Sequence, residues 1–239
     1  MIEVLTRIDL LASSGATPWH RASAIGKLGL ALLLILLAVS VPGLRALVAL
    51  YAIAWLLALS SRLPAGLVLA ASGYPIAFSL LFVLGRWDGT WRTPLALLLR
   101  PLAASLVAVW LVGTTPYPDL FAPLSRVLPR GVADGLFLTY RALFQLLERV
   151  ERLWSALRLR GGTSGPPRRR LTAAGEGLGT LVLYGFERSQ RLFATMQLRG
   201  HSGRVCGCRH YAETSAADAW VALVALAAAA STLMLWRAG

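Results

Sequence analysis

Long apolar runs constrain this chain more than any other feature of its sequence. They occupy residues 24–60, in two closely spaced parts, and then residues 63–84, 93–115 and 216–236. With 56% hydrophobic residues, the chain is too apolar for an ordinary soluble domain. A run of about 18 or more apolar residues is long enough to cross a bilayer as a helix. The sequence therefore predicts an all-α, polytopic membrane helical bundle with about five transmembrane helices.

Prolines and glycines divide these runs. Pro42-Gly43 predicts a short turn between the first two spans. Gly73 and Pro75 predict a kink in the third span, because proline lacks a backbone donor and neighbouring helices tolerate this in a membrane. Arg100-Pro101 interrupts the fourth span. That pair leaves two readings open: one helix with a snorkelling arginine, or a surface helix followed by a short crossing.

The distribution of basic residues predicts the orientation. The net charge is +13, and Lys27 is the only lysine. Five crossings would place the N-terminal segment (1–23) and a long polar block (116–215) on the same side, which holds most of the 24 basic residues. The positive-inside rule makes that side cytoplasmic. We therefore expect an N-in arrangement, with transmembrane helices 1–4 in residues 24–115 and the last one in 216–239.

The polar block contains a short repeat. Residues 148–161 read ERVERLWSALRLRG, and residues 187–200 read ERSQRLFATMQLRG. The offset is 39, and seven of the fourteen positions are identical. Apolar spacing in each copy is helical and predicts helices over about 132–160 and 171–199. The intervening residues, 161–170, read as a flexible linker.

Both copies end in Leu-Arg-Gly, which permits two interpretations. Arginine in a last helical turn interacts well with the helix dipole, and glycine commonly follows a helix end. Capping alone, however, does not need the matching residues upstream. An arginine fork also grips carboxylates while staying charged. A duplicated arginine tip therefore favours docking to two equivalent acidic sockets.

Three segments carry a resemblance to a known family: TTPYPDLFAPL, LFLTYRALFQLLERVERLWSALRLRGG and GLGTLVLYGFERSQRLFATMQLRGHSG. They resemble the T component of energy-coupling factor (ECF) transporters, the CbiQ/EcfT family. The resemblance covers the chain loosely and is specific over about residues 114–203. In that family, two cytoplasmic coupling helices end in Ala-x-Arg-Gly-type motifs that dock into two ABC-type ATPase subunits.

The resemblance implies ATPase-docking residues at two tips. In the family, a small residue usually stands two places before the arginine-glycine pair, whereas here those places hold Arg158 and Gln197. The implied docking residues are Ala156, Arg158, Arg160 and Gly161 in the first tip, and Ala194, Met196, Arg199 and Gly200 in the second.

The resemblance also implies a function without catalysis. The chain would be a non-enzymatic coupling subunit in the plasma membrane of a bacterium or archaeon, and it would need no cofactor. It would pass ATPase motion to a separate substrate-binding S component in the bilayer. The absence of a Walker-type loop from the sequence agrees with this. Cobalt or nickel is the preferred substrate, and biotin or another vitamin is the alternative.

Other interpretations have less support in the sequence. Cys206, Cys208 and His210 form a weak candidate metal site, because their spacing is not that of a standard zinc site. An autonomous channel or a membrane enzyme would need polar or ligating residues within the spans, which hold almost none. Arg168–Arg170 could touch anionic lipid or nucleic acid, but a solvated linker is the simpler reading, and we expect no nucleic-acid partner.

Overall fold

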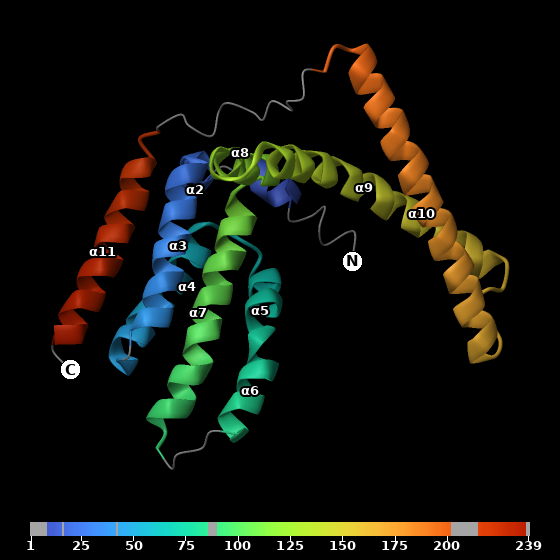
Figure 1. Ribbon diagram of the computed structural model, residues 1–239. Coiled ribbons are helices and arrows are strands. Elements are labelled where there is room, and N and C mark those ends of the chain that lie inside the picture. Colours follow the sequence, from blue (N-terminus) through green and yellow to red (C-terminus); the bar gives the residue numbers. More distant parts are fainter. Residues whose placement is uncertain (1–8, 16, 42, 86–89, 202–214, 238–239) are drawn as a thin grey trace. The chain divides into compact units, whose positions relative to one another are not determined.

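The computed structural model describes residues 9–15, 17–41, 43–85, 90–201 and 215–237 (Figure 1). Within these ranges the regular structure is helical, and no strand occurs among the described residues. The chain divides into two compact units. One unit contains Met1–Pro123 and Cys208–Gly239, and the other contains Leu124–Gly207.

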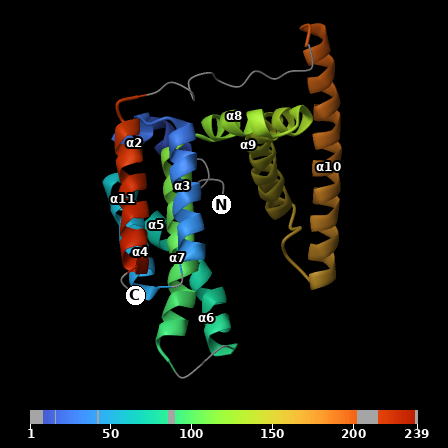
Figure 2. The same cartoon turned by 60° about the vertical axis from the view of Figure 1, so that its left-hand side comes forward.

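The first unit is a bundle of apolar helices arranged around α7 (Figures 1 and 2). Helix α7 contacts α3, α4, α5 and α6, while α11 packs on α3 and α4. Helix α8 (Tyr117–Val127) follows α7 and spans the division between the units. The helices of the bundle are α2 (Pro18–Arg21), α3 (Ala24–Ser40), α4 (Leu44–Ser60), α5 (Ala65–Gly73), α6 (Pro75–Gly85), α7 (Arg92–Thr114) and α11 (Asp218–Arg237).

The core of the bundle consists mainly of apolar side chains from α3, α4 and α7, with further contributions from α2, α5 and α11. Leu47, Leu106 and Trp110 are completely buried, and the ring of Trp19 meets that of Trp110 edge-on at 5.8 Å. Large apolar side chains also cover the outside of the bundle: Phe82, for example, is 70% exposed. Soluble proteins rarely expose so many large apolar side chains, and such a surface suits contact with lipid.

The expectation of an all-α, polytopic membrane bundle is confirmed. Among the described residues, three helical stretches are long and apolar enough to cross a membrane: Ala65–Gly85, Arg92–Thr114 and Asp218–Leu235. Helices α3 and α4 are apolar but have 17 residues each. They are at the short end of the range that can span a bilayer, and the total of five crossings depends on them.

The two proline-containing spans differ in the structure. The third span breaks as expected: α5 ends at Gly73 and α6 begins at Pro75. The alternative that the fourth span consists of two pieces is wrong, because α7 runs unbroken through Pro101. Arg100 within it donates from Nη2 to the carbonyl of Val41, 3.0 Å away, at the end of α3. The guanidinium therefore donates to a carbonyl at the C-terminal end of α3 that has no hydrogen-bond partner within the helix.

Two polar contacts join helix ends at one end of the bundle. The Nζ of Lys27, a residue only 1% exposed, donates to the carbonyl of Thr114 at 2.9 Å. The Asp218 carboxylate accepts hydrogen bonds from the amides of Ser23 (2.7 Å) and Ser215 (3.0 Å). These bonds tie α3 to the end of α7 and to the beginning of α11.

The second unit is dominated by an antiparallel pair of long helices, α9 (Arg130–Leu159) and α10 (Pro167–Leu198). They approach closely at Gly177, where an added Cβ would lie 3.2 Å from a methyl of Leu153 and 3.3 Å from one of Leu157. The expected boundaries hold within a few residues for α9. The expected linker is too long, however, because Pro167 starts α10 and places Arg168–Arg170 in its first turn. Proline suits that position, since its φ is already helical and its missing N–H is not needed.

Candidate functional site

The first copy of the repeat ends in a tightly hydrogen-bonded turn. Arg160 caps α9, and Gly161 adopts a left-handed backbone with a φ of 70°. The amide of Gly162 donates to the carbonyl of Leu157 at 2.8 Å, and the amide of Gly161 donates to that of Arg158 at 3.1 Å. This pair of bonds is the Schellman motif, which satisfies carbonyls left over at the helix end.

The second copy ends in the same turn. Arg199 caps α10, and Gly200 has a φ of 73°. The amide of His201 donates to the carbonyl of Met196 at 3.0 Å, and the amide of Gly200 donates to that of Gln197 at 3.0 Å. Every donor and acceptor is displaced by 39 residues from its counterpart in the first copy. The sequence repeat is therefore also a repeat of backbone structure.

An almost fully exposed leucine stands beside the capping arginine in each copy. Leu159 is 89% exposed and Leu198 is 87% exposed, and both arginines, Arg160 and Arg199, are exposed as well. The sequence analysis did not include these leucines among the docking residues. The sequence signal that could have identified them is that leucine occupies the same position in both copies of the repeat. We define the first tip as residues 158–161 and the second as residues 197–200.

The upstream part of the repeat is also duplicated in the structure. Glu148 pairs with Arg152 in α9, and Glu187 pairs with Arg191 in α10. Both pairs are exposed, so each adds at most a few tenths of a kcal/mol. The equivalent arginines of the two copies, 149 and 188, both contact Tyr184: one lies over its ring at 4.8 Å and the other donates to its hydroxyl at 3.4 Å.

The predicted docking residues fall into two groups. Arg158, Ala194 and Gly200 are exposed, like the capping arginines. Ala156, Gly161 and Met196 are half-buried, and Met196 lines a cleft of about 590 Å³ between α9 and α10. This cleft is bounded by residues 138–146 of α9 and 184–196 of α10. Met196 therefore faces the cleft between the two helices, whereas the exposed residues face solvent.

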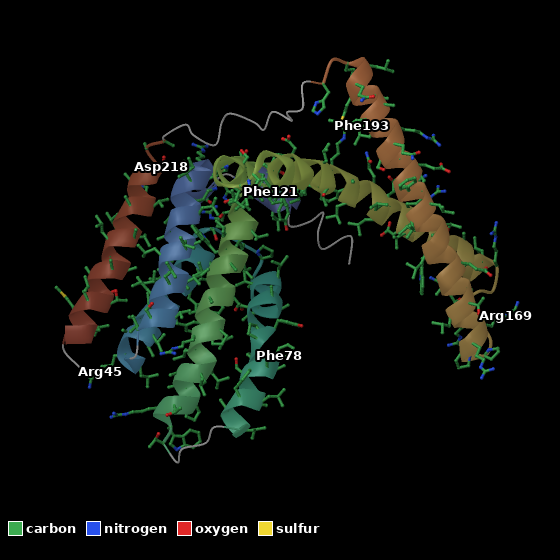
Figure 3. The ribbon with its side chains drawn as sticks, in the orientation of Figure 1. Arg45, Phe78, Phe121, Arg169, Phe193 and Asp218 are labelled. Carbon is green, nitrogen blue, oxygen red and sulfur yellow. The ribbon has the colours of Figure 1, made fainter. Side chains whose placement is uncertain are left out.

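The structure keeps the two tips apart. The first tip adjoins the beginning of α10, and the second lies at the other end of that helix. Since α10 has 32 residues, the helix is about 48 Å long. Figure 3 shows this separation through Arg169, near the first tip, and Phe193, near the second. The two exposed ends are therefore about the length of α10 apart.

The weak metal candidate lies outside the described residues, because Cys206, Cys208 and His210 belong to the segment 202–214. Across the described ranges, no group of three or more His, Cys, Asp or Glu side chains is placed to hold a metal ion.

Together, the bundle and the duplicated helix ends define a polytopic α-helical membrane protein with two exposed helix ends of the same structure. A family model described as CbiQ, cobalt transport protein, matches residues 15–207, which include both tips. The chain belongs to this family of cobalt transport proteins. None of the curated proteins matches the chain.

Proposed function

We propose that this chain is the T component of an ECF-type ABC importer in the plasma membrane of a bacterium or archaeon. In this role each tip docks into one of two ABC-type ATPase subunits. The observation that carries the proposal is the duplicated tip, in which an exposed leucine and an exposed arginine are presented by the same backbone turn. Membership of a cobalt transport family and the apolar bundle support it.

The proposed mechanism is mechanical. ATP binding closes the two ATPase subunits, the tips follow them, and α9 and α10 shift. The motion then reorients a separate substrate-binding S component in the bilayer. The chain itself neither hydrolyses ATP nor holds the substrate. Cobalt or nickel is the proposed cargo because the family is one of cobalt transport, and a vitamin such as biotin is the alternative.

The docking residues of this proposal are those at the tips: Arg160 and Arg199 as the charged contacts, with Arg158, Gly161 and Gly200 beside them. An arginine in water at a helix end contributes little alone, but when enclosed by a partner it makes short bidentate bonds to a carboxylate. The exposed leucines supply apolar area that excludes water from these bonds, and the exclusion of water strengthens them.

Co-purification from detergent tests the docking. The chain is expressed with the ABC-type ATPase subunits of its source organism, as wild type and as Arg160→Ala/Arg199→Ala. We expect the amount of ATPase that co-purifies with the double variant to fall by about tenfold or more, because truncating a central charged contact costs about 2 kcal/mol or more. The matched control is Arg152→Ala/Arg191→Ala, which removes the same charge from equivalent repeat positions. Equal ATPase recovery from all three proteins would refute the proposal.

The proposed orientation has a separate test. The two cysteines, 206 and 208, would face the cytoplasm. A membrane-impermeant maleimide should therefore label them in inside-out vesicles and leave them unlabelled in right-side-out vesicles. Labelling only in right-side-out vesicles would show that the orientation is opposite to the proposed one.

A further inference from the structure

A pocket opens at the end of the bundle where α4 turns into α5. It has a volume of about 500 Å³ and lies within the first unit. Residues between Leu11 and His20 form one wall, and Ser60–Leu63 form the other. Serine and threonine hydroxyls, the His20 ring and the Arg62 side chain line it, and none of its described lining residues is acidic. The pocket can therefore receive a negatively charged group without repulsion from a carboxylate in its walls.

Arg62 supplies the permanent charge of this pocket. Burial lowers the pKa of His20, and the positive charge of Lys27 lowers it further, so the ring is mostly neutral near pH 7. The guanidinium of Arg62, by contrast, stays charged at any cellular pH. Arg62 is exposed, and neither of the ion pairs among the described residues includes it. Its guanidinium is thus available to an anion from outside the chain.

The backbone of Arg62 is left-handed, which disfavours arginine at this position. Its φ is 54°, and no other non-glycine residue in the described ranges has a positive φ. The amide of Arg62 donates to the carbonyl of Leu59 at 3.1 Å and so closes the end of α4. Helices α9 and α10 place Gly161 and Gly200 in the equivalent left-handed position. Glycine would suit position 62 better, so the side chain of Arg62 must have a use that offsets the strain.

The outer surface beside the pocket is apolar. Leu56 and Leu59 in the last two turns of α4 are exposed, and so is Leu69 in α5. These helices belong to the apolar bundle, and α5 begins a stretch that is long enough to cross a membrane. An arginine at the end of a membrane helix lies at the level of the lipid headgroups. Arg62 is therefore placed at headgroup level, with exposed leucines below it that suit acyl chains.

We infer that this pocket binds the headgroup of an anionic phospholipid, with Arg62 donating to the phosphate and the acyl chains lying along Leu56 and Leu59. A guanidinium matches phosphate oxygens with two parallel N–H bonds, and basic pockets between membrane helices bind such headgroups. A zwitterionic headgroup fits less well, because it brings a cation and the described walls offer no carboxylate to it. The site belongs to the bundle and does not depend on docking of the tips to an ATPase.

The test measures the thermal unfolding midpoint of the full chain in uncharged detergent with added phosphatidylglycerol, or with the same amount of phosphatidylcholine. The buffer is free of phosphate, and one further sample combines phosphatidylcholine with inorganic phosphate. The variants are Arg62→Gln, which removes the charge, and Arg62→Gly, which also removes the backbone strain. The matched control is Arg45→Gln, because Arg45 is an exposed arginine at the opposite end of α4 (Figure 3).

We expect phosphatidylglycerol to raise the wild-type midpoint by about 2–4 °C over phosphatidylcholine, since a ligand that binds only the folded chain stabilises it. Arg45→Gln should keep this rise, whereas both Arg62 variants should lose it. In phosphatidylcholine, Arg62→Gly should unfold no lower than the wild type, because glycine fits the left-handed backbone. A purely structural role of Arg62 would instead lower that midpoint.

Three kinds of result would overturn the inference. The first is a wild type that shows no rise, or an Arg62→Gln variant that keeps it. The second is an equal loss of the rise in Arg45→Gln, which would assign the effect to general surface charge, or an equal rise with inorganic phosphate, which would assign the pocket to a soluble anion. The third is a lower midpoint of Arg62→Gly in phosphatidylcholine. All of them would leave the proposed function intact, since no ATPase takes part in the measurement.

Discussion

Gly161 and Gly200 lie 39 residues apart and share a left-handed backbone, with φ values of 70° and 73°. Nothing lies within 4 Å of where a Cβ would stand at either position. Contacts with neighbouring atoms therefore do not require glycine at these positions. The requirement for glycine comes from the left-handed backbone angle. A left-handed angle costs an ordinary L-residue about 1–2 kcal/mol and is tolerated best by asparagine.

Substitution at these two glycines should disturb the tips alone. We expect Gly161→Val/Gly200→Val to loosen both Schellman turns, and Gly161→Asn/Gly200→Asn to preserve most of their structure. Hydrogen exchange at the amides of Gly162 and His201 reports the turns directly, since both donate across them. Unchanged protection of these amides in the valine variant would contradict the assigned conformation.

The close approach of α9 and α10 at Gly177 predicts a different outcome. A larger side chain there must push against Leu153 and Leu157. We expect Gly177→Leu to lower the free energy of unfolding of the helix pair by about 1–3 kcal/mol. Gly179 is the matched control, because an added Cβ at that position meets nothing within 4 Å. Gly179→Leu should be neutral or stabilising through helix propensity. Equal thermal unfolding midpoints for the two variants would argue against this packing.

The two exposed leucines should matter for binding and not for stability. Leu159→Ser/Leu198→Ser removes apolar area that the isolated chain does not bury. The unfolding midpoint should stay near that of the wild type, while ATPase recovery falls by about tenfold or more. Leu183→Ser is the control, because this leucine of α10 is 65% exposed and lies away from both tips. If the control loses ATPase binding to the same extent, the surface of α10 that contacts the ATPase is broader than the two tips.

The sequence allowed prediction of the features that depend on local patterns. Apolar runs are set by the thickness of the bilayer, and a helix end followed by glycine has few alternative structures. For this reason the bundle and both helix ends at Arg160 and Arg199 were predicted within a residue or two. The break between α5 and α6 followed from Pro75 in the same way.

Contacts between distant segments could not be read from local patterns. Arg100 was expected to snorkel or to mark a break, but it reaches the carbonyl of Val41, 59 residues away in the sequence. Likewise, no local pattern indicated that Lys27 is buried against the carbonyl of Thr114. Such partners depend on which helix ends meet, and that is decided by the packing of the whole bundle. The role of Gly177 is likewise visible only once α9 lies beside it.

His20 should make the stability of the first unit depend on pH. Burial lowers the pKa of His20 below its usual 6.5, and the positive charge of Lys27 lowers it further. Between the folded pKa and 6.5, the unfolded chain binds more protons than the folded one, so stability rises with pH in that window. The contribution of neutral His20 is therefore present above 6.5 and is lost as the pH falls toward the folded value.

The measurement compares wild type with His20→Gln, by thermal unfolding in detergent from about pH 5 to about pH 8. The difference between the two midpoints should change below pH 6.5 and remain constant above it. The hydroxyl of Thr17 lies 2.6 Å from Nδ1 of His20, so Thr17→Ala serves as a control that keeps the titrating ring. Parallel pH profiles for wild type and His20→Gln would contradict a proton-linked role.

Asp218 predicts a coupling between α3 and α11. One carboxylate oxygen accepts from the amide of Ser23, the N-cap of α3, and the other from the amide of Ser215, just before α11. A single negative charge thus serves two helix beginnings, where N–H groups lack intrahelical partners and the dipoles favour an anion. Asp218→Ala removes both acceptors and should lower the free energy of unfolding by about 2–4 kcal/mol, the sum of two caps. Asp218→Asn keeps one acceptor oxygen and should lose about half as much. Measured as unfolding midpoints in detergent, equal losses in the two variants would show that charge, rather than the pair of hydrogen bonds, holds α3 and α11 together.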